Sequence, residues 1–302
     1  MNRKAVIAFS FLMSLMLSAQ DIIPLWPEGK MPNSKGLNLE HIEERERITQ
    51  VSSPKMLAYF PPKEEQNGSS ILILPSGGYA KLTYNLGGIQ LAKWFNTQGI
   101  TAFVLIYRLP NSPDLLIPEN GPVQDAQRAM KLIRKHASKW QLDENKVGIF
   151  GSSAGGHLAS TIATHQTDVS KIKDSTDSYP FLPNFMVLVS PVISFGDYTH
   201  KGSLQNFLGE NPSPEKIKAY SNEFHVTENT PPTILFHAQN DPAVNAMNSL
   251  LFYEQMMKHK VDGSLHIFPK GEHNIGIYNE SSLTDEWKNI CTKWLKEMKI
   301  TK

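Results

Sequence analysis

The fold is decided by one stretch of the sequence, which reads Val147-Gly148-Ile149-Phe150-Gly151-Ser152-Ser153-Ala154-Gly155-Gly156-His157. Its first residues form a short apolar run, which is typical of a buried strand. A turn of small residues follows, and a helical pattern then extends from Gly156 to Thr164. We therefore predict a strand, a tight turn and a helix in direct succession, with Ser153 at the turn.

Apolar runs and helical patterns alternate on both sides of this stretch. We expect strands at residues 47–51, 56–60, 70–74, 101–107, 146–150, 185–189, 232–237 and 264–268, and helices at 89–98, 123–140, 156–164, 245–258 and 283–298. This alternation predicts an α/β fold, with a mostly parallel central sheet and helices on both faces. Residues 196–229 break the rhythm. We expect them to form a small insertion over the carboxyl edge of the sheet, where ligands bind in open α/β sheets.

The composition is that of an ordinary globular protein. The chain has 302 residues, of which 40% are hydrophobic and 20% charged, with 30 Lys and Arg against 29 Asp and Glu. A net charge near zero gives no indication of a nucleic acid or an anionic membrane as a partner. We expect residues 21–302 to form a single domain. The sequence does not define its oligomeric state.

Residues 1–20 differ from the rest of the chain. Two basic residues at positions 3 and 4 precede the apolar run Ala5–Leu17, and the small residues Ser18 and Ala19 follow it. This pattern predicts a secretory signal peptide cleaved near Ala19 or Gln20, hence a periplasmic or secreted protein with no stable membrane insertion after cleavage. The alternative is a membrane anchor, but the run is shorter than the roughly 20 residues that a spanning helix needs.

The single cysteine, Cys291, has no partner for an internal disulfide bond. It lies in a helical pattern beside Trp294 and Leu295, so we expect it to be buried. The sequence contains neither a pair of cysteines nor a His-x-x-x-His spacing. We therefore expect no metal site and no cofactor.

Residues 151–155 fit the pattern G-x-S-x-G, which is weak alone because Gly and Ser are common. Its position between a strand and a helix is the setting that a nucleophilic serine requires. Side chains at Gly151 or Gly155 would clash with neighbouring backbone, and the turn pushes Ser153 towards strained dihedral angles. We predict that Ser153 is the nucleophile, the alternative being a small-residue turn without chemistry. Ser152 stands one position too early, and we expect it to be structural.

Backbone N–H groups that can stabilise an oxyanion follow two of the predicted strands. One belongs to Ala154, at the start of the helix after the nucleophile. The stretch Pro75-Ser76-Gly77-Gly78-Tyr79 follows an earlier strand, and its glycines allow the backbone to approach a substrate oxygen closely. We expect the second donor to be Gly77, Gly78 or Tyr79, and the sequence leaves the choice open. The alternative is an ordinary Gly-Gly turn.

A serine nucleophile needs a general base and a carboxylate, which in this arrangement follow later strands. Asp241 comes shortly after the strand at 232–237, and His273 comes shortly after the strand at 264–268. We predict that His273 is the base and that Asp241 orients it and stabilises its charged form. The alternative for Asp241 is a turn residue before Pro242.

Other acids and histidines fit these roles less well. Asp262 and Glu272 do not follow the appropriate strand. His266 lies within a strand, and we expect it to be buried or a surface residue. We expect His157 to pack within its helix and His237 to support the loop that carries the carboxylate.

These motifs occur together in one known group of enzymes. They are Leu25-Trp26-Pro27-Glu28-Gly29, Pro75-Ser76-Gly77-Gly78-Tyr79, Gln124-Asp125-Ala126-Gln127-Arg128-Ala129, Gly151-Ser152-Ser153-Ala154-Gly155-Gly156-His157-Leu158-Ala159, Pro231-Pro232-Thr233, Asn240-Asp241-Pro242 and Gly271-Glu272-His273. On these residues the chain resembles the secreted carbohydrate esterases of the α/β-hydrolase superfamily, in their acetyl xylan esterase-like and feruloyl esterase-like branch. The resemblance covers nearly the whole mature chain.

The resemblance implies an α/β-hydrolase fold and a serine esterase that removes O-acyl, often O-acetyl, groups from plant or algal glycans such as xylan. It places the triad on Ser153, Asp241 and His273, with an acylated carbohydrate as substrate and no cofactor. The alternatives are a feruloyl-type or general short-chain carboxylesterase, a peptidase of the same fold, and a catalytically inactive glycan-binding protein.

The sequence departs from the family pattern near the predicted site. Ser76 stands where relatives usually have a third glycine, and Asn240-Asp241 stands where they often have an acidic pair. Glu272 stands where they usually have a glycine before the histidine. The first two departures bear on loop shape, and the third puts a charge beside the site and leaves substrate preference open.

Overall fold

The computed structural model describes residues 21–274 and 286–301. The strands are β1 Asp21–Pro24, β2 Ile42–Glu44, β3 Arg47–Gln50, β4 Lys55–Tyr59, β5 Ser70–Leu74, β6 Thr101–Ile106, β7 Val147–Ser152, β8 Phe185–Val189, β9 Thr233–Ala238 and β10 Gly263–Phe268. The helices are α1 Gln90–Thr97, α2 Asn120–Lys135, α3 Ala137–Trp140, α4 Ser153–Thr164, α5 Lys201–Leu208, α6 Pro214–Ala219, α7 Met247–Lys258 and α8 Glu286–Glu297. Short helical turns are η1 Asn85–Ile89, η2 Ser175–Ser178, η3 Asn222–His225 and η4 Glu272–Asn274. The predicted signal peptide lies outside the described residues.

The central sheet has eight strands in the order β1-β4-β6-β5-β7-β8-β9-β10. β4 is antiparallel to both of its neighbours, and all the strand pairs from β6 to β10 are parallel. Strands β5 to β9 are buried along their whole length, which explains why they appear in the sequence as continuous apolar runs. The predicted α/β class and the mostly parallel sheet are confirmed.

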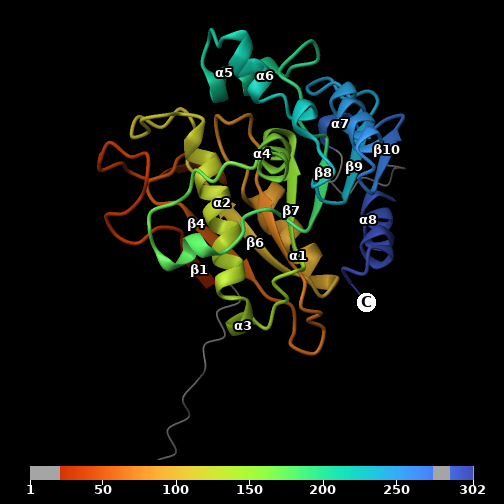
Figure 1. Cartoon of the computed structure of the whole chain (residues 1–302), viewed down its shortest axis with the longest axis horizontal. Coiled ribbons are helices and arrows are strands. Elements are labelled where there is room, and N and C mark those ends of the chain that lie inside the picture. Colours follow the sequence, from red (N-terminus) through yellow and green to blue (C-terminus); the bar gives the residue numbers. More distant parts are fainter. Residues whose placement is uncertain (1–20, 275–285, 302) are drawn as a thin grey trace, which may run out of the picture.

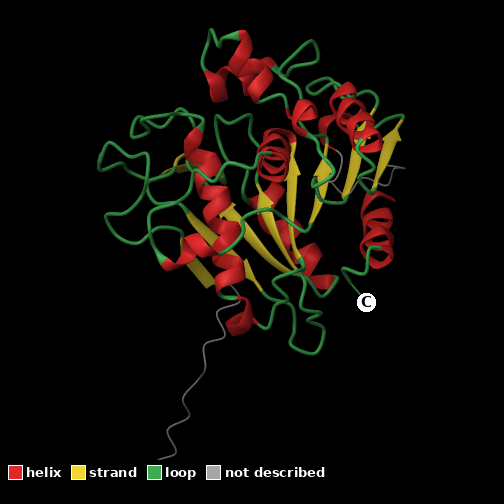
Figure 2. Ribbon diagram, in the orientation of Figure 1, coloured by secondary structure: helices red, strands yellow, loops and turns green. Residues whose placement is uncertain are grey.

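Helices cover both faces of this sheet (Figure 2). The chain moves from β5 to β6 in one direction along the sheet and from β6 to β7 in the other. Because crossovers are right-handed, α1 and α2 must lie on opposite faces, and α4 and α7 share the face of α2. On the face of α1, Trp94 meets Trp287 of α8 with ring centroids 5.3 Å apart.

The order of the strands predicts a ligand crevice between β5 and β7. These two strands are neighbours, but the chain leaves them towards opposite faces of the sheet. Ligands bind in open α/β sheets at such a point, outside the carboxyl ends of the strands. The loop beginning at Pro75 follows β5 and Ser153 follows β7, so both predicted sources of site residues meet at this crevice.

Residues 196–229, expected to be an insertion, form α5, α6 and η3. Figure 1 shows α5 and α6 above the end of the sheet towards which the strand arrows point. This is the carboxyl edge, where the crevice lies. Within the part of the chain that the structure describes, no helix has the length and apolar character needed to cross a bilayer.

The structure differs from the sequence-based expectations at several elements. Residues 47–50 form β3, which pairs with β2 in a separate two-stranded ribbon and not in the central sheet. The edge strand β1 was not expected, because its residues are largely exposed and form no buried run. The helix expected at 123–140 is α2 followed by α3, since His136 leaves helical geometry at φ −101° and ψ 8°. The helix expected from Gly156 begins at Ser153.

A buried ion pair ties the amino-terminal segment to α2. Asp125, on α2, accepts hydrogen bonds from Trp26 Nε1 at 2.8 Å, from the Arg108 backbone N–H at 2.8 Å and from Arg108 Nη2 at 2.9 Å. One turn later, Arg128 donates to the Leu25 carbonyl and lies 5.1 Å from the centroid of the Trp26 ring. The motifs around Trp26 and Asp125 therefore hold the scaffold together.

Cys291, on α8, is fully buried, as expected. Burial raises the pKa of its thiol above the ordinary value. The thiol therefore belongs to the packing of the α8 face.

Candidate active site

The turn between β7 and α4 is built around close backbone contacts. A Cβ on Gly155 would lie 2.1 Å from the Leu74 carbonyl oxygen, and one on Gly151 would lie 2.2 Å from the Gly155 carbonyl oxygen. Ser153 itself has φ 52°, in the left-handed region that costs a non-glycine residue energy. The tight turn therefore presents Ser153 at the carboxyl end of β7, immediately beside the end of β5.

Ser153, His273 and Asp241 form one hydrogen-bonded chain. His273 Nε2 lies 2.9 Å from Ser153 Oγ, and His273 Nδ1 lies 2.7 Å from Asp241 Oδ2. Ser153 is 8% exposed, and the side chain of His273 is 28% exposed while that of Asp241 is fully buried. The buried carboxylate is thus connected through the imidazole to a hydroxyl group at the surface of the crevice.

The chemistry of the partners defines where the protons lie. A carboxylate only accepts, so Nδ1 of a neutral His273 donates to Asp241, which leaves Nε2 to accept from the Ser153 hydroxyl. Burial of Asp241 opposes its charged form, but hydrogen bonds from His237, His273 and the Val244 N–H outweigh it. The pKa of the Asp241 carboxyl therefore lies well below its ordinary value. The carboxylate is ionised throughout the neutral pH range.

The loop after β9 holds Asp241 rigidly. Asp241 Oδ1 accepts the backbone N–H groups of Ala243 and Val244, each at 2.9 Å. His237 Nε2 lies 2.9 Å from the Val244 carbonyl oxygen and 3.4 Å from Asp241 Oδ2. Its Nδ1 lies 2.8 Å from Ser249 Oγ on α7. The expected support of this loop by His237 is confirmed.

The loop after β5 lies against the start of α4. The Cβ position of Gly155 is 3.1 Å from the Pro75 carbonyl oxygen, so the first turn of α4 packs against the start of the loop that contains Gly77 and Gly78. Within the described residues, no acceptor meets the N–H groups of Gly77 or Gly78. The Ala154 N–H lies in the first turn of α4, where the helix itself supplies no acceptor. The N–H groups of the three predicted donors are therefore available to a ligand, and their role in binding an oxyanion stays a prediction.

Comparison with known proteins supports the resemblance found in the sequence. The BD-FAE family profile matches residues 56–256, more than half of the 302-residue chain. The chain belongs to the BD-FAE family. The family and the α/β-hydrolase fold expected from the sequence motifs are confirmed.

Relatives of this BD-FAE protein include a solved structure described as the acetyl ester-xyloside bifunctional hydrolase of Caldicellulosiruptor lactoaceticus. The two are 33% identical with a TM-score of 0.81, and the match covers 93% of this chain and 97% of that chain. An acetylxylan esterase of Xylanibacter ruminicola is 34% identical over 253 residues, 82% of this chain and 49% of the relative. The endo-1,4-beta-xylanase B of Butyrivibrio fibrisolvens is 33% identical over 230 residues, 75% of this chain and 35% of the relative. The chain thus spans about half or less of these two curated relatives.

The departures of this BD-FAE chain from the family pattern have local structural roles. Ser76 Oγ lies 2.9 Å from Thr83 Oγ1, and the Thr83 N–H donates to the Ser76 carbonyl at 2.9 Å, which closes the loop after β5. Asn240 Oδ1 accepts the Glu272 N–H at 3.1 Å, which links the loops that carry Asp241 and His273. Glu272 is exposed and has φ 51°, a conformation that explains why a glycine suits this position in relatives.

Two buried hydrogen bonds that the sequence motifs did not predict link the loop after β5, helix α4 and the insertion of this BD-FAE chain. Tyr79 Oη lies 2.8 Å from His157 Nδ1, and His157 Nε2 lies 2.8 Å from the Tyr220 carbonyl oxygen. The carbonyl can only accept, so Nε2 carries the proton and the Tyr79 hydroxyl donates to Nδ1. Burial lowers the pKa of His157 to about 3, so the ring stays neutral. The expected packing of His157 is confirmed, but its link from the oxyanion loop to the insertion was not anticipated.

The remaining candidates from the sequence lie apart from this chain of hydrogen bonds. Ser152 Oγ is buried without a partner among the described residues. His266, on the edge strand β10, stacks on Phe236 with ring centroids 5.3 Å apart. In the described ranges, no group of three or more His, Cys, Asp or Glu side chains has the arrangement of a metal site.

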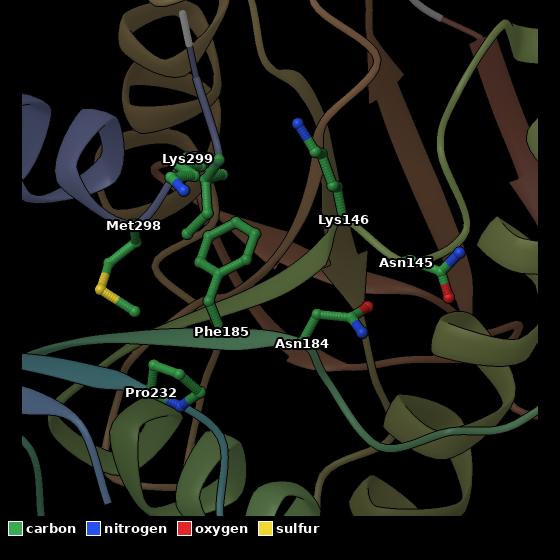
Figure 3. Close-up of a pocket in the computed structure, with 8 residues that line it drawn as sticks. Asn145, Lys146, Asn184, Phe185, Pro232, Met298 and Lys299 are labelled. Carbon is green, nitrogen blue, oxygen red and sulfur yellow. The ribbon is translucent and has the colours of Figure 1, made fainter.

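Figure 3 shows a cavity of about 180 Å³ lined by Asn145, Lys146, Asn184, Phe185, Pro232, Met298, Lys299 and Ile300. Its lining residues cluster at the starts of β7, β8 and β9. Ser153 follows the opposite end of β7, so this cavity is on the far edge of the sheet and is separate from the candidate site.

Proposed function

We propose that this chain is a serine esterase that removes O-acyl groups, and O-acetyl groups in particular, from a polysaccharide such as xylan or from its oligosaccharides. The observation that carries the proposal is the hydrogen-bonded chain Ser153–His273–Asp241 at the crevice between β5 and β7. The proposed roles are Ser153 as nucleophile, His273 as base and then acid, and Asp241 as the group that orients His273.

In the acylation half of the proposed reaction, Ser153 Oγ attacks the ester carbonyl carbon while His273 Nε2 takes the hydroxyl proton. The carbonyl oxygen becomes an oxyanion, and the N–H groups of Ala154 and of Gly77 or Gly78 donate to it. His273 then returns the proton to the departing alkoxide oxygen. The sugar leaves with a free hydroxyl group, and the acyl group stays on Ser153.

In the deacylation half, a water molecule occupies the place of the alcohol. His273 Nε2 takes a proton from the water as its oxygen attacks the acyl carbon. Collapse of the second oxyanion returns the proton to Ser153 Oγ and releases the carboxylic acid. Water enters as the only co-reactant in this scheme, and the atoms balance without a cofactor.

The relatives support the choice of substrate. The solved relative, which matches nearly its full length, is described as an acetyl ester-xyloside hydrolase, and a curated relative is described as an acetylxylan esterase. We infer that residues 21–302 act as one catalytic unit, with residues 196–229 forming one wall of its site. Export remains part of the proposal, supported by the basic and apolar pattern of residues 1–20.

The test uses mature protein on nitrophenyl acetate and on acetylated xylo-oligosaccharides, beside Ser153→Ala. We expect hydrolysis of both esters and a loss of about 10⁴-fold or more in kcat for the variant, because a triad without its nucleophile retains little activity. The matched control is Ser152→Ala, one residue away, whose hydroxyl has no partner among the described residues. We expect it to keep near-wild-type activity.

Other outcomes would overturn parts of the proposal. Activity that persists in Ser153→Ala contradicts the nucleophile, and no ester hydrolysis at all favours a binding protein. Release of amino acids from peptides favours a peptidase. A series of acetate, butyrate and ferulate esters then separates an acetyl esterase from a general short-chain or feruloyl-type esterase.

A further inference from the structure

His200 lies beside the oxyanion loop but belongs to none of the motifs that define the proposed triad. It begins the insertion helix α5, and its Cε1 lies 3.9 Å from the position of a Cβ on Gly78. The same helix is fixed to that loop, because Asn206 Nδ2 donates to the Gly78 carbonyl at 2.8 Å. Phe207 also stacks against Tyr79 with ring centroids 4.7 Å apart. His200 is therefore held at the rim of the site by a firmly packed helix.

The hydrogen bonds of His200 define which of its nitrogens carries the proton. Nδ1 accepts the backbone N–H of Ser203 at 3.1 Å and lies 2.8 Å from Ser203 Oγ, in a side chain that is fully buried. Nδ1 must be the acceptor, since a backbone N–H can only donate. The neutral ring consequently carries its proton on Nε2. Among residues 21–274 and 286–301, Nε2 has no hydrogen-bond partner.

The charge state of His200 agrees with this geometry. Burial of the ring, and then the charge of His273, lower the pKa of His200 below its ordinary value, although Asp241 opposes the change. The ring lies beside Gly78, in the loop that contains the proposed oxyanion donors. The Nε2–H group is thus a hydrogen-bond donor beside the proposed site that has no acceptor among the described residues.

We propose that His200 Nε2–H donates a hydrogen bond to a hydroxyl or ring oxygen of the sugar that carries the acyl group. This inference rests on the proposed function. In an acetyl ester bound for reaction, the carbonyl oxygen meets the backbone N–H groups and the alkoxy oxygen meets His273. The methyl group accepts nothing, so the acceptors left for His200 are those of the sugar. His200 is then a specificity-determining residue that distinguishes sugar esters from esters of plain alcohols.

The test compares two substrates in His200→Asn and His200→Ser. Both replacements retain a side-chain oxygen that can cap α5 through the Ser203 N–H, but neither reaches the position of Nε2. We expect kcat/KM for an acetylated xylo-oligosaccharide to fall about 3- to 10-fold, mainly through KM, because one neutral hydrogen bond is lost. For nitrophenyl acetate, whose alcohol has no sugar oxygens, we expect a change of less than about twofold. Thermal unfolding of both variants reports whether the cap has been retained.

The matched control is His225→Asn, a histidine of the same insertion that packs on His165 with ring centroids 4.4 Å apart. His165 follows the far end of α4 from Ser153, so we expect the control to leave both kcat/KM values unchanged. Equal losses on both substrates, or no loss on either, overturn the role of His200 while leaving the proposed function intact. A wild-type protein that hydrolyses nitrophenyl acetate but no sugar ester overturns the proposed function and this inference together.

Discussion

Asp125 and Asp241 are both buried carboxylates, but their surroundings differ in one respect. Every partner of Asp125 is part of the scaffold: the Trp26 indole, the Arg108 backbone and the Arg108 guanidinium. Asp241 has backbone partners on one oxygen only. Its other oxygen meets His273, whose side chain is 28% exposed and whose second nitrogen reaches Ser153.

The difference supports a division of roles in which Asp125 is structural and Asp241 serves the proposed reaction. A buried ion must be paired, and both carboxylates meet that requirement. The charged partner of Asp125 is the Arg108 guanidinium, which takes no part in proton transfer, so this ion pair holds elements of the fold together. The second oxygen of Asp241 meets the imidazole of His273, which also lies against the Ser153 hydroxyl. Burial alone therefore does not identify the candidate site, whereas a buried carboxylate joined through an imidazole to a serine hydroxyl does.

Replacing Asp241 by Asn tests its proposed role in the reaction, and it has the larger expected effect on activity of the two carboxylate replacements. The amide introduced at this position would favour the wrong tautomer of His273, so we expect kcat for ester hydrolysis to fall about 10³- to 10⁴-fold. The side chain keeps its shape and an oxygen for the Val244 N–H, so the unfolding midpoint should move by only a few degrees. Steady-state kinetics and calorimetry measure the two quantities. A variant that retains a tenth of the wild-type kcat contradicts the role of Asp241.

Replacing Asp125 by Asn tests its structural role in the buried ion pair with Arg108. Removing one partner of a buried ion pair leaves the Arg108 guanidinium without its counter-charge, which typically costs about 3 to 5 kcal/mol. We expect the free energy of unfolding to fall by that amount in urea titrations. The folded fraction should keep kcat/KM within about threefold of wild type, because Ser153 and His273 are untouched.

A double variant sharpens this second prediction. Adding Arg108→Met to Asp125→Asn removes the unpaired charge and should restore part of the lost stability. A large loss of kcat with normal stability in Asp125→Asn would mean that the two carboxylates do not divide the roles as described.

The sequence was sufficient for the parts of the fold and the site that depend on strand ends. Strands such as β7 are buried on both faces, so their apolar runs are continuous and easy to recognise. The carboxyl ends of parallel strands meet at one edge, which is why the sequence could predict that Ser153, Asp241 and His273 lie together, as the structure shows. Edge strand β1 has no such apolar run, because its residues are largely exposed. Its place in the sheet comes from its pairing with β4, which the sequence does not show.

Contacts that depend on the path of loops were not predictable in this way. Tyr79 and His157 are separated by 78 positions, and neither motif indicates that their side chains meet. His200 lies in an insertion whose sequence does not follow the alternation of strands and helices that marks the core. Such residues are placed by packing between an insertion and the core, which local propensity does not encode.

His157 is a third buried titratable side chain, and it differs from the two buried carboxylates because burial keeps it uncharged. Its pKa is about 3 in the folded protein against an ordinary value of 6.5, because burial disfavours the charged ring. The unfolded chain then binds the extra proton, so stability is complete above pH 6.5 and falls as the pH drops towards the folded value. Between about pH 6.5 and 5 the expected loss is about 2 kcal/mol. Urea titrations over this range should give a flatter profile for His157→Gln than for wild type; identical slopes would contradict the neutral ring.

The smallest expected effect tests how much the link between the two site loops matters. Asn240 accepts the Glu272 N–H from an exposed position and touches neither Ser153 nor His273 directly. Asn240→Ala removes this hydrogen bond, which is worth about 0.5 to 1 kcal/mol, so we expect kcat to fall about threefold as His273 loses some of its orientation. Asn289→Ala, at an exposed asparagine on α8 whose hydrogen-bond partner among the described residues is Glu286 of the same helix, should leave kcat unchanged. If kcat is also unchanged in Asn240→Ala, the backbone partners of Asp241 suffice to position the imidazole. Asp241 would then resemble Asp125 in being held by its own partners, without help from the exposed contact between the two loops.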